Sequence, residues 1–315
     1  MNRLVRSLLS TSCRGKFLAG GFAATQSLVR NMSAAAMSKY NFETLVVTSP
    51  EEFVYKVEMN RPEKRNAMNK AFWREMVECF NIIARDEDCR VVLLTGAGKM
   101  FSAGIDIQDN AELMQGSGGD SELDVARVAE RIRNKVKDYQ ETFFVLEKCP
   151  KPVIAAVHGG CLGGGMCMIS GCDIRVCTED AWFQVKETDL GLAADVGVLQ
   201  WLPHKTGNDS LLRELCFTAR RFDAKEAREI GLVSRVYSDH EAMLGGAMEL
   251  AADIASKSPV AVQGTKVNLN YSRDHSIADS FDYAATWNAA RLQTEDVMKG
   301  VMASMTKSKA EFSKL

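Results

Sequence analysis

Three carboxylates stand close together in the stretch VKETDLGLAADVG, which runs from Val185 to Gly197. Glu187, Asp189 and Asp195 are surrounded there mostly by glycine, alanine, valine and leucine. A carboxylate in an apolar setting loses hydration, which raises its pKa toward the range in which it exchanges a proton near neutral pH. The stretch therefore predicts acid/base chemistry.

Each of these carboxylates also has a plainer interpretation. Asp195 directly precedes VGVLQWL and could cap a helix, which would lower its pKa instead. Glu187 could be a surface charge paired with Lys186, and Asp189 is interpreted as a solvated or turn residue. From the residues alone, both interpretations of Asp195 and of Glu187 stay open.

Two glycine-containing segments could bring backbone amides to a ligand. MFSAGIDI (residues 100–107) and HGGCLGGGM (residues 158–166) each follow a predicted strand, and the second opens a predicted helix. Glycine lets backbone approach closely, and the first N–H groups of a helix lack partners and favour negative charge. Together the segments could direct two N–H donors at one oxygen, although tight turns alone would explain either. Neither contains the G-x-x-x-x-G-K-[ST] pattern of a phosphate loop.

The elements that must position these groups alternate between helix and strand. KAFWREMVECFNIIARD has apolar residues at helical spacing and precedes the apolar strand RVVLLTG; residues 124–148 precede PVIAAVHG in the same way. Before them, residues 45–59 predict a hairpin with its turn at residues 49–52, and from about residue 242 the pattern is helical. This alternation predicts an α/β fold with buried strands.

Composition narrows the class of protein. The chain has 315 residues, of which 46% are apolar and 25% charged, as in soluble globular proteins. Nine cysteines without a C-x-x-C pair and four scattered histidines predict neither a disulfide framework nor a metal site. No apolar run approaches the ~18 residues of a membrane span.

Both ends of the chain resemble targeting signals. Residues 1–42 contain no acidic residue but six basic ones among serines and leucines, which is typical of a mitochondrial transit peptide, with a disordered tail as the alternative. The last residues, Ser313-Lys314-Leu315, match a peroxisomal address, unless by chance. Without the six basic residues, the formal charge falls from −2 to −8, so nucleic acid is not an expected partner.

Several motifs, in order, resemble those of a known family. RPEKRNAMN, FSAGIDI, CPKPVIAAVHGGCLGGG and DIRVC resemble the crotonase (enoyl-CoA hydratase/isomerase) superfamily. FQVKETDLGLAADVG and SKSPVAVQGTKVNLNYSRDHS are similar to its Δ3,5-Δ2,4-dienoyl-CoA isomerase branch. The resemblance runs from about Phe42 to the C-terminus.

The resemblance implies a fold and an organisation. The fold would be α/β, a ClpP-like spiral of β-β-α units over residues 43–241, after a leader at residues 1–42. A helical region at residues 242–315 would mediate assembly as a homotrimer or homohexamer and end in the peroxisomal signal. The implied locations are the mitochondrial matrix and the peroxisome, with the import receptors of both as partners.

The resemblance also implies a reaction, in which a 3,5-dienoyl-CoA becomes a 2,4-dienoyl-CoA with no metal and no cofactor besides the CoA of the substrate. Backbone N–H groups of Ile105 and Gly164 would hold the thioester oxygen, with Glu187 and Asp195 as the acid/base groups. The implied CoA-binding residues are Asn66, Ala67, Met68, Ala103, Gly104, Asp106 and Ile107.

One position departs from the family pattern. Cys167 stands where hydratases have glutamate and dienoyl isomerases have aspartate. Because hydration needs two carboxylates on one water, a cysteine argues against a hydratase. The alternatives are another crotonase-type isomerase or hydratase, a catalytically weakened acyl-CoA-binding homologue, and an RNA-binding relative. A nucleophilic role for Cys167 is a further alternative.

Overall fold

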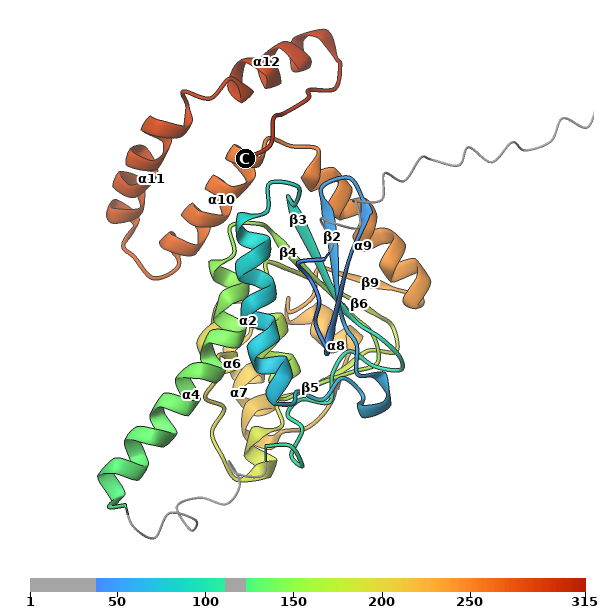
Figure 1. Cartoon of the computed structure of the whole chain (residues 1–315), viewed down its shortest axis with the longest axis vertical. Helices are drawn as coiled ribbons and strands as arrows, with labels where there is room; N and C mark the ends of the chain where they lie inside the picture. Colours follow the sequence, from blue (N-terminus) through green and yellow to red (C-terminus); the bar gives the residue numbers. More distant parts are fainter. Residues whose placement is uncertain (1–37, 111–122) are drawn as a thin grey trace, which may run out of the picture.

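The first two strands in the described part of the chain, β1 (Leu45–Glu51) and β2 (Val54–Met59), form an antiparallel hairpin. The computed structural model describes residues 38–110 and 123–315, so the expected leader lies outside the described residues up to residue 37 (Figure 1). The predicted position of the turn was wrong, because the turn lies around Phe53 and β1 continues through Pro50. Pro50 is tolerated there because β1 is the edge strand of its sheet.

Six strands form the main sheet in the order β1-β2-β3-β4-β6-β9, and every pairing after the hairpin is parallel. All residues of β3 and β4 are buried, which explains why their sequences are apolar without alternation. The strands that follow the hairpin are β3 (Val91–Gly96), β4 (Val153–Val157), β6 (Ile174–Thr178) and β9 (Arg235–Tyr237).

Helices cover both faces of this sheet (Figure 1). On one face, α2 (Lys70–Arg85) and α4 (Val125–Lys148) contribute to the larger apolar core, which includes Tyr55 and Val57 of β2. On the other face, α9 (His240–Ala255) packs its buried alanines against β3, β4 and β6. Helices α2 and α4 therefore lie where the apolar spacing of the sequence predicts them.

A smaller sheet of β5 (Gly160–Leu162), β7 (Trp182–Gln184) and β8 (Phe222–Asp223) adjoins the main one. Isolated parallel bridges join Met68 to Ile105 and Ser102 to Cys161, so three separate segments run side by side. The second glycine-containing segment ends there and α5 (Gly164–Gly171) begins. After β7 come the 3-10 turn η3 (Glu187–Leu190), α6 (Val198–Trp201), α7 (Asp209–Thr218) and α8 (Ala224–Glu229).

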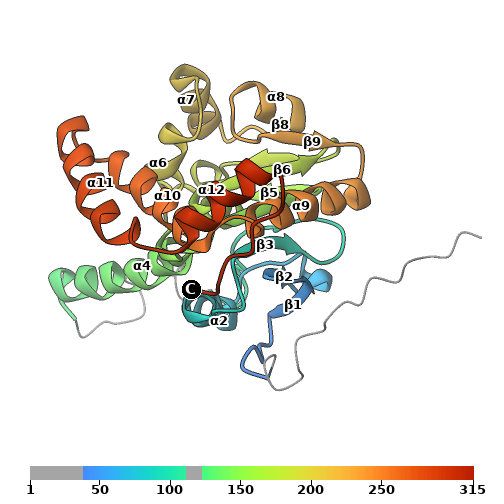
Figure 2. The same ribbon diagram turned by 90° about the horizontal axis from the view of Figure 1, so that it is seen from above.

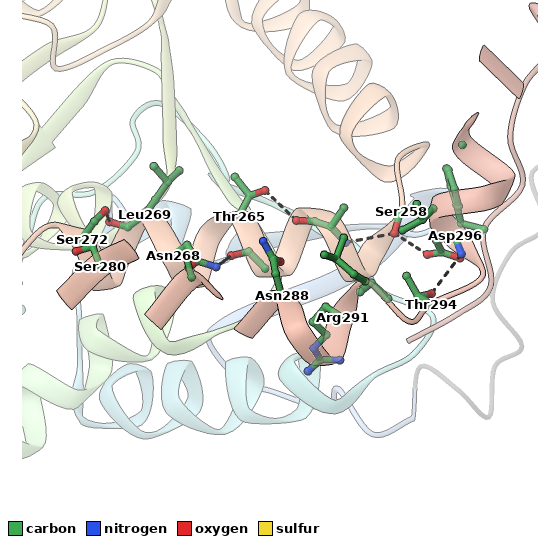
Figure 3. A pocket seen from close by; sticks show the side chains of 18 of the residues that line it. Ser258, Thr265, Asn268, Leu269, Ser272, Ser280, Asn288, Arg291, Thr294 and Asp296 are labelled. Atoms are coloured by element: carbon green, nitrogen blue, oxygen red, sulfur yellow. Dashed lines mark hydrogen bonds between the residues drawn. The ribbon is translucent and has the colours of Figure 1, made fainter. Parts of the chain in front are cut away.

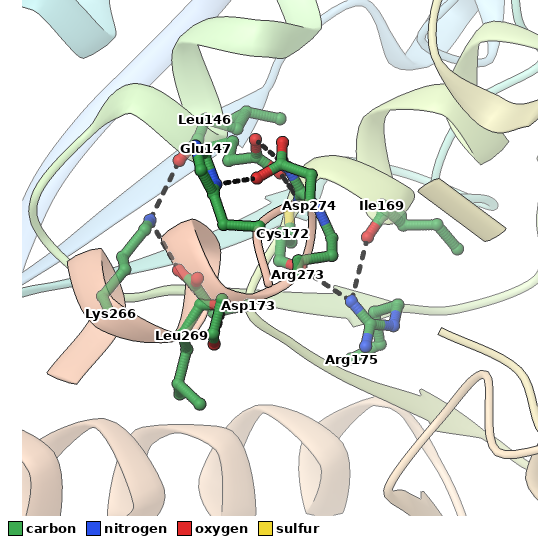
Figure 4. Close-up of polar contacts among 12 residues, drawn as sticks. Leu146, Glu147, Ile169, Cys172, Asp173, Arg175, Lys266, Leu269, Arg273 and Asp274 are labelled. Atoms are coloured by element: carbon green, nitrogen blue, oxygen red, sulfur yellow. Dashed lines mark hydrogen bonds and ion pairs between the residues drawn. The ribbon is translucent and has the colours of Figure 1, made fainter. Parts of the chain in front are cut away.

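The C-terminal region is helical, and its first helix, α9, begins at His240. α10 (Pro259–Ser272), α11 (Ile277–Arg291) and α12 (Asp296–Thr306) follow it and lie to one side of the sheet (Figures 1 and 2). Buried Lys266 of α10 donates to the Leu146 and Lys151 carbonyls at 3.0 and 3.1 Å and pairs with Asp173 at 2.7 Å (Figure 4). α10 is thereby tied to the main body.

The described part of the chain contains eight cysteines, all of them buried and free. Within the same ranges, no group of three or more histidine, cysteine or acidic side chains is arranged to hold a metal. No helix there combines the length and the apolar character that crossing a bilayer requires.

Candidate active site

The backbone amide of Ile105 points away from the neighbouring segment around Met68. Met68 donates to the Gly104 carbonyl at 2.8 Å, and its own carbonyl accepts from the amide of Asp106 at 3.0 Å. Because Met68 thus bonds the residues on either side of Ile105, the Ile105 N–H faces the opposite side. Among the described residues it has no acceptor.

Gly164 supplies a second free amide, because it is the first residue of α5. The preceding Gly163 donates to the Gln184 carbonyl at 3.0 Å, and its carbonyl accepts from Met166 and Cys167. No acceptor for the Gly164 N–H occurs in the ranges that the structure describes.

The two free amides lie in loops that touch. A Cβ placed on Gly104, whose φ is +83°, would lie 3.0 Å from the Leu162 carbonyl oxygen and 3.5 Å from the Gly164 nitrogen. A side chain at this position would push the loops apart, so glycine is needed both for its backbone angle and for the close approach. The structure therefore brings the amides of Ile105 and Gly164 together.

Glu187 lies beside this amide pair. A Cβ built on Gly163 would be 3.7 Å from its Oε1, and the residue is 9% exposed. Its Oε2 has no hydrogen-bond partner in the described structure. Burial raises the pKa of Glu187, and the nearby charge of Asp195 raises it further, while backbone N–H groups partly oppose the shift. The ionised form of Glu187 is therefore electrostatically unfavourable, which favours uptake of a proton.

The surface-charge interpretation of Glu187 was wrong. Lys186 pairs instead with Asp189, whose Oδ2 lies 2.5 Å from the lysine Nζ. That pair is solvent-exposed, as predicted for Asp189.

Asp195 lies in the loop between η3 and α6, and it does not cap the helix. The residue that caps α6 is Gly197, with φ at 129° and no side-chain hydrogen bond to the helix. The capping interpretation of Asp195 was therefore wrong. Although Asp195 is exposed at the surface of the chain, loss of solvent raises its pKa.

The loop of Asp195 is fastened to α4. Gln140 of that helix donates its Nε2 to the Asp195 backbone carbonyl at 2.7 Å. Sequence inspection missed Gln140, because the two residues are 55 positions apart and a single glutamine on an amphipathic helix carries no signal.

Cys167 is the third member of the cluster. It lies on α5 with no exposed surface, and its Sγ is 4.0 Å from Glu187 Oε1. Burial raises the pKa of Cys167 well above its ordinary value, and the neighbouring Glu187 and Asp195 add to the rise. The side chain is therefore a neutral thiol, which disfavours the nucleophilic interpretation.

Among the residues implied to bind CoA, Asn66 already uses its side chain. Its Oδ1 accepts from the Arg61 amide, and its Nδ2 donates to three carbonyls of the 97–101 loop, at 2.8 to 3.1 Å. The Asn66 backbone is engaged as well, since its amide donates to the Arg61 carbonyl and its carbonyl accepts from Ser102 Oγ, both at 2.9 Å, so Asn66 shapes the loop.

The other implied CoA-binding residues line the same strip of backbone. Asp106 pairs with Arg61 at 3.1 Å; burial alone would raise the pKa of Asp106, but the guanidinium outweighs it and the pKa is lowered. Arg61 also donates to the Ala67 carbonyl, and the Ala103 amide donates to the Arg65 carbonyl at 2.9 Å. Ile107 is half exposed. Arg61, which sequence inspection did not single out, holds this strip together.

Comparison with known proteins gives the family. A family model described as enoyl-CoA hydratase/isomerase matches residues 50–314. The chain belongs to the enoyl-CoA hydratase/isomerase family. The resemblance stated from the motifs is confirmed.

Relatives within the family share most of their length with this chain. A mouse protein named Delta(3,5)-Delta(2,4)-dienoyl-CoA isomerase, mitochondrial, is 59% identical over 283 residues, covering 89% of this chain and 85% of the relative. An Arabidopsis thaliana protein of the same name, but peroxisomal, is 40% identical over 280 residues, covering 89% of this chain and 99% of the relative.

Solved structures agree with the family assignment. The crystal structure of an enoyl-CoA hydratase from Bacillus anthracis superposes with a TM-score of 0.77 at 29% identity, over 86% of this chain and 99% of that one. The predicted α/β crotonase fold is therefore confirmed.

Proposed function

We propose that this enzyme isomerises 3,5-dienoyl-CoA to 2,4-dienoyl-CoA, in the auxiliary β-oxidation of unsaturated fatty acids. The observation that carries the proposal is the buried Glu187 carboxylate, with one oxygen unpartnered, beside the free Gly164 amide and the charge of Asp195. Relatives at 59% identity bear the name of this activity.

The amide pair accounts for the ionic intermediate. Removing a proton from carbon 2 of the substrate gives a dienolate whose negative charge rests largely on the thioester oxygen. The N–H groups of Ile105 and Gly164 would donate to that oxygen. A preorganised donor of this kind typically stabilises the transition state by about 3 kcal/mol.

Two carboxylates are needed because the proton leaves one carbon and arrives at another. Carbons 2 and 6 are about 5 Å apart in an extended chain by ordinary bond lengths, beyond the reach of one fixed group. One of Glu187 and Asp195 would take the proton from carbon 2, and the other would deliver one to carbon 6. One proton leaves the substrate and another is delivered to it, so substrate and product have the same composition and no electrons are exchanged. We therefore propose that no cofactor or metal is required.

Cys167 separates this reaction from hydration. A hydratase must hold and polarise a water between two carboxylates, but the thiol 4.0 Å from Glu187 is neutral. The same residue keeps a weakened, acyl-CoA-binding homologue as the second candidate, because one expected acid of the site is absent.

The activity is tested by following the absorbance of the conjugated dienoyl thioester. We expect wild type to convert 3,5-dienoyl-CoA, and Glu187→Gln and Asp195→Asn each to lower kcat by about 10²–10⁴-fold. Asp189→Asn, a matched change in the exposed pair with Lys186, should leave kcat unchanged. No turnover by wild type, with CoA-ester binding retained in all variants, would favour the weakened homologue; turnover of a 3-enoyl-CoA alone would favour simple enoyl isomerisation.

We also propose that the protein is a homotrimer or a homohexamer. Helix α11 has no buried residue, although Ile277 and Phe281 are apolar and more than 70% exposed. A cleft of about 860 Å³ runs between α10, α11 and α12, and Figure 3 shows it between the helices. Contact with a second copy of the chain would cover these surfaces.

The proposed locations are the mitochondrial matrix and the peroxisome. The basic, acid-free residues 1–42 and the C-terminal Ser-Lys-Leu support import into one organelle each, through the corresponding receptors. The mouse relative is named as mitochondrial and the Arabidopsis one as peroxisomal. RNA is not a proposed partner, since the chain without its leader carries a formal charge of −8.

A further inference from the structure

A buried asparagine lies beside the segment that presents the Ile105 amide. Asn110 is 1% exposed and stands four residues after Asp106 in the chain. Its backbone amide donates to the Asp106 carbonyl at 3.0 Å, which closes the turn between the two residues. Asn110 is not one of the residues that the motifs implied, so nothing in the sequence assigned it a role.

The side chain of Asn110 joins the two segments on either side of the bridge between Met68 and Ile105. Its Nδ2 donates to the Met68 carbonyl at 3.0 Å and to the Asp106 carbonyl at 2.9 Å. A side-chain amide carries two N–H donors, so one donor serves each segment. The Met68 carbonyl also accepts from the Asp106 amide at 3.0 Å, and Asn110 therefore reinforces the bond that holds Met68 in place.

The position of Met68 determines where the Ile105 N–H points. The Met68 amide donates to the Gly104 carbonyl at 2.8 Å. In a planar trans peptide the C=O and the N–H point in opposite directions, so the Ile105 N–H is directed away from Met68. A shift of Met68 would turn this peptide plane and redirect the N–H.

Asn110 is in turn oriented by α4. Tyr139 donates its hydroxyl to Asn110 Oδ1 at 3.3 Å, which fixes the orientation of the side-chain amide. Tyr139 is 7% exposed, and its ring centre lies 4.4 Å from that of Trp73 on α2. The next residue of α4, Gln140, holds the Asp195 carbonyl. Neighbouring residues of one helix thus support the amide side and the carboxylate side of the site.

We propose that Asn110 is a positioning residue, which acts through Met68 to keep the Ile105 N–H directed at the thioester oxygen of the substrate. The proposal rests on the proposed function, in which the N–H groups of Ile105 and Gly164 donate to that oxygen. An asparagine that only stabilised the loop would affect the binding of every CoA ester alike. A positioning residue affects the charged intermediate more than the uncharged substrate, because the N–H binds a developing oxyanion most strongly.

The test separates these two roles with a ligand that ionises without being isomerised. Acetoacetyl-CoA is in equilibrium with its enolate, which carries negative charge on the thioester oxygen and is followed by its ultraviolet absorbance. Octanoyl-CoA has no comparable enolate and reports binding alone. The enolate-to-keto ratio of bound acetoacetyl-CoA, the affinity for octanoyl-CoA and kcat for 3,5-dienoyl-CoA are measured for wild type, Asn110→Ala and Tyr139→Phe. Asn81→Ala, the same change at an exposed residue of α2, is the control.

We expect Asn110→Ala to lower the enolate-to-keto ratio and kcat about tenfold each, while octanoyl-CoA binds within about twofold of wild type. The loss is smaller than the roughly 10²–10³-fold that follows removal of a donor, because Ile105 keeps its N–H and only the direction changes. Tyr139→Phe, which removes one hydrogen bond, should lower both quantities about threefold. Asn81→Ala should match wild type.

Three outcomes would count against the proposal. An unchanged enolate-to-keto ratio in folded Asn110→Ala, or an equal loss of octanoyl-CoA affinity, would overturn the positioning role. If Asn110→Ala does not fold, Tyr139→Phe decides, and a wild-type ratio in that variant would contradict the proposal. A wild type that neither stabilises the enolate nor converts the dienoyl substrate would overturn the proposed function, and this proposal with it.

Discussion

Glu187 is placed where an ionised carboxylate costs stability. It is buried, one of its oxygens lacks a partner, and Asp195 carries a like charge nearby. A purely structural residue would not be kept in such a setting without compensation, whereas a group that takes up and returns a proton benefits from it.

This placement predicts how stability depends on pH. Burial and Asp195 raise the pKa of Glu187 above its ordinary value of 4.5, so the native state holds the proton more tightly than the unfolded chain. Its contribution to the free energy of unfolding therefore falls as pH rises from about 4.5 through the raised pKa. Glu187→Gln removes this loss, so its melting temperature relative to wild type should increase from pH 4 to pH 8. If the difference in melting temperature between Glu187→Gln and wild type stayed constant or decreased over this pH range, burial of Glu187 would not be unfavourable for its ionised form.

The pH profile of the reaction follows from the same two groups. Because burial raises the pKa of both Glu187 and Asp195, the acid limb of kcat/KM should lie above the ordinary carboxyl range. Cys167→Asp places another negative charge next to Glu187 and should move that limb to higher pH, whereas neutral Cys167→Ser should not. Identical limbs in both variants, measured with folded protein, would show that position 167 does not act on Glu187.

The sequence was sufficient to place both carboxylates in the right stretch, but not to choose between their interpretations. Whether Asp195 caps a helix depends on where α6 begins. The helix begins at Val198, and its N-cap residue is Gly197. The solvation of Glu187 depends on α5 and the segment around Gly163, both distant in sequence. The apolar surroundings allow a catalytic role for both carboxylates, and the family motifs favour it.

Among the elements, the loop of Asp195 is the one that the sequence predicts least. It has no regular structure, and Gln140 on α4 holds its backbone. The long helices and the apolar strands β3 and β4 follow directly from their spacing, because local pattern decides them. Tertiary contacts such as those of Gln140 leave no periodic signal.

Removing the Gln140 side chain should lower the reaction rate more than the stability of the fold. Gln140→Ala frees the Asp195 carbonyl, and we expect kcat to fall about tenfold as the carboxylate loses its position. The melting temperature should change little, because the contact is exposed. Gln200→Ala, in the nearby exposed surface of α6, is the matched control and should keep full kcat. An unchanged kcat in Gln140→Ala would mean that the loop is positioned by other contacts.

The exposed surface of the C-terminal helices bears on how the chain assembles with other copies of itself. Lys266 and Arg273 tie α10 to the body, through Asp173 and Glu147, whereas no residue of α11 beyond it is buried. Exposed apolar side chains such as Ile277 and Phe281 are typical of a surface that another chain covers.

We therefore expect Phe281→Asp to break the assembly. Its ring is 74% exposed in the single chain, and a carboxylate there would resist burial against a second copy. Light scattering after size-exclusion chromatography should show a trimer or hexamer for wild type and smaller species for the variant. Val125→Asp, at an equally exposed apolar residue of α4, is the control and should keep the wild-type mass. A wild type that is monomeric at micromolar concentration would contradict the proposed assembly.

The division of labour between two carboxylates is tested most directly by proton NMR of 3,5-dienoyl-CoA in D₂O. Wild type should move the double bonds and introduce deuterium. In one of Glu187→Gln and Asp195→Asn, the surviving base should still exchange the carbon 2 protons without moving the double bonds, and the other variant should do neither. Isomerisation at the wild-type rate by either variant, or identical exchange in both, would contradict a mechanism in which Glu187 and Asp195 serve different carbons of one dienolate.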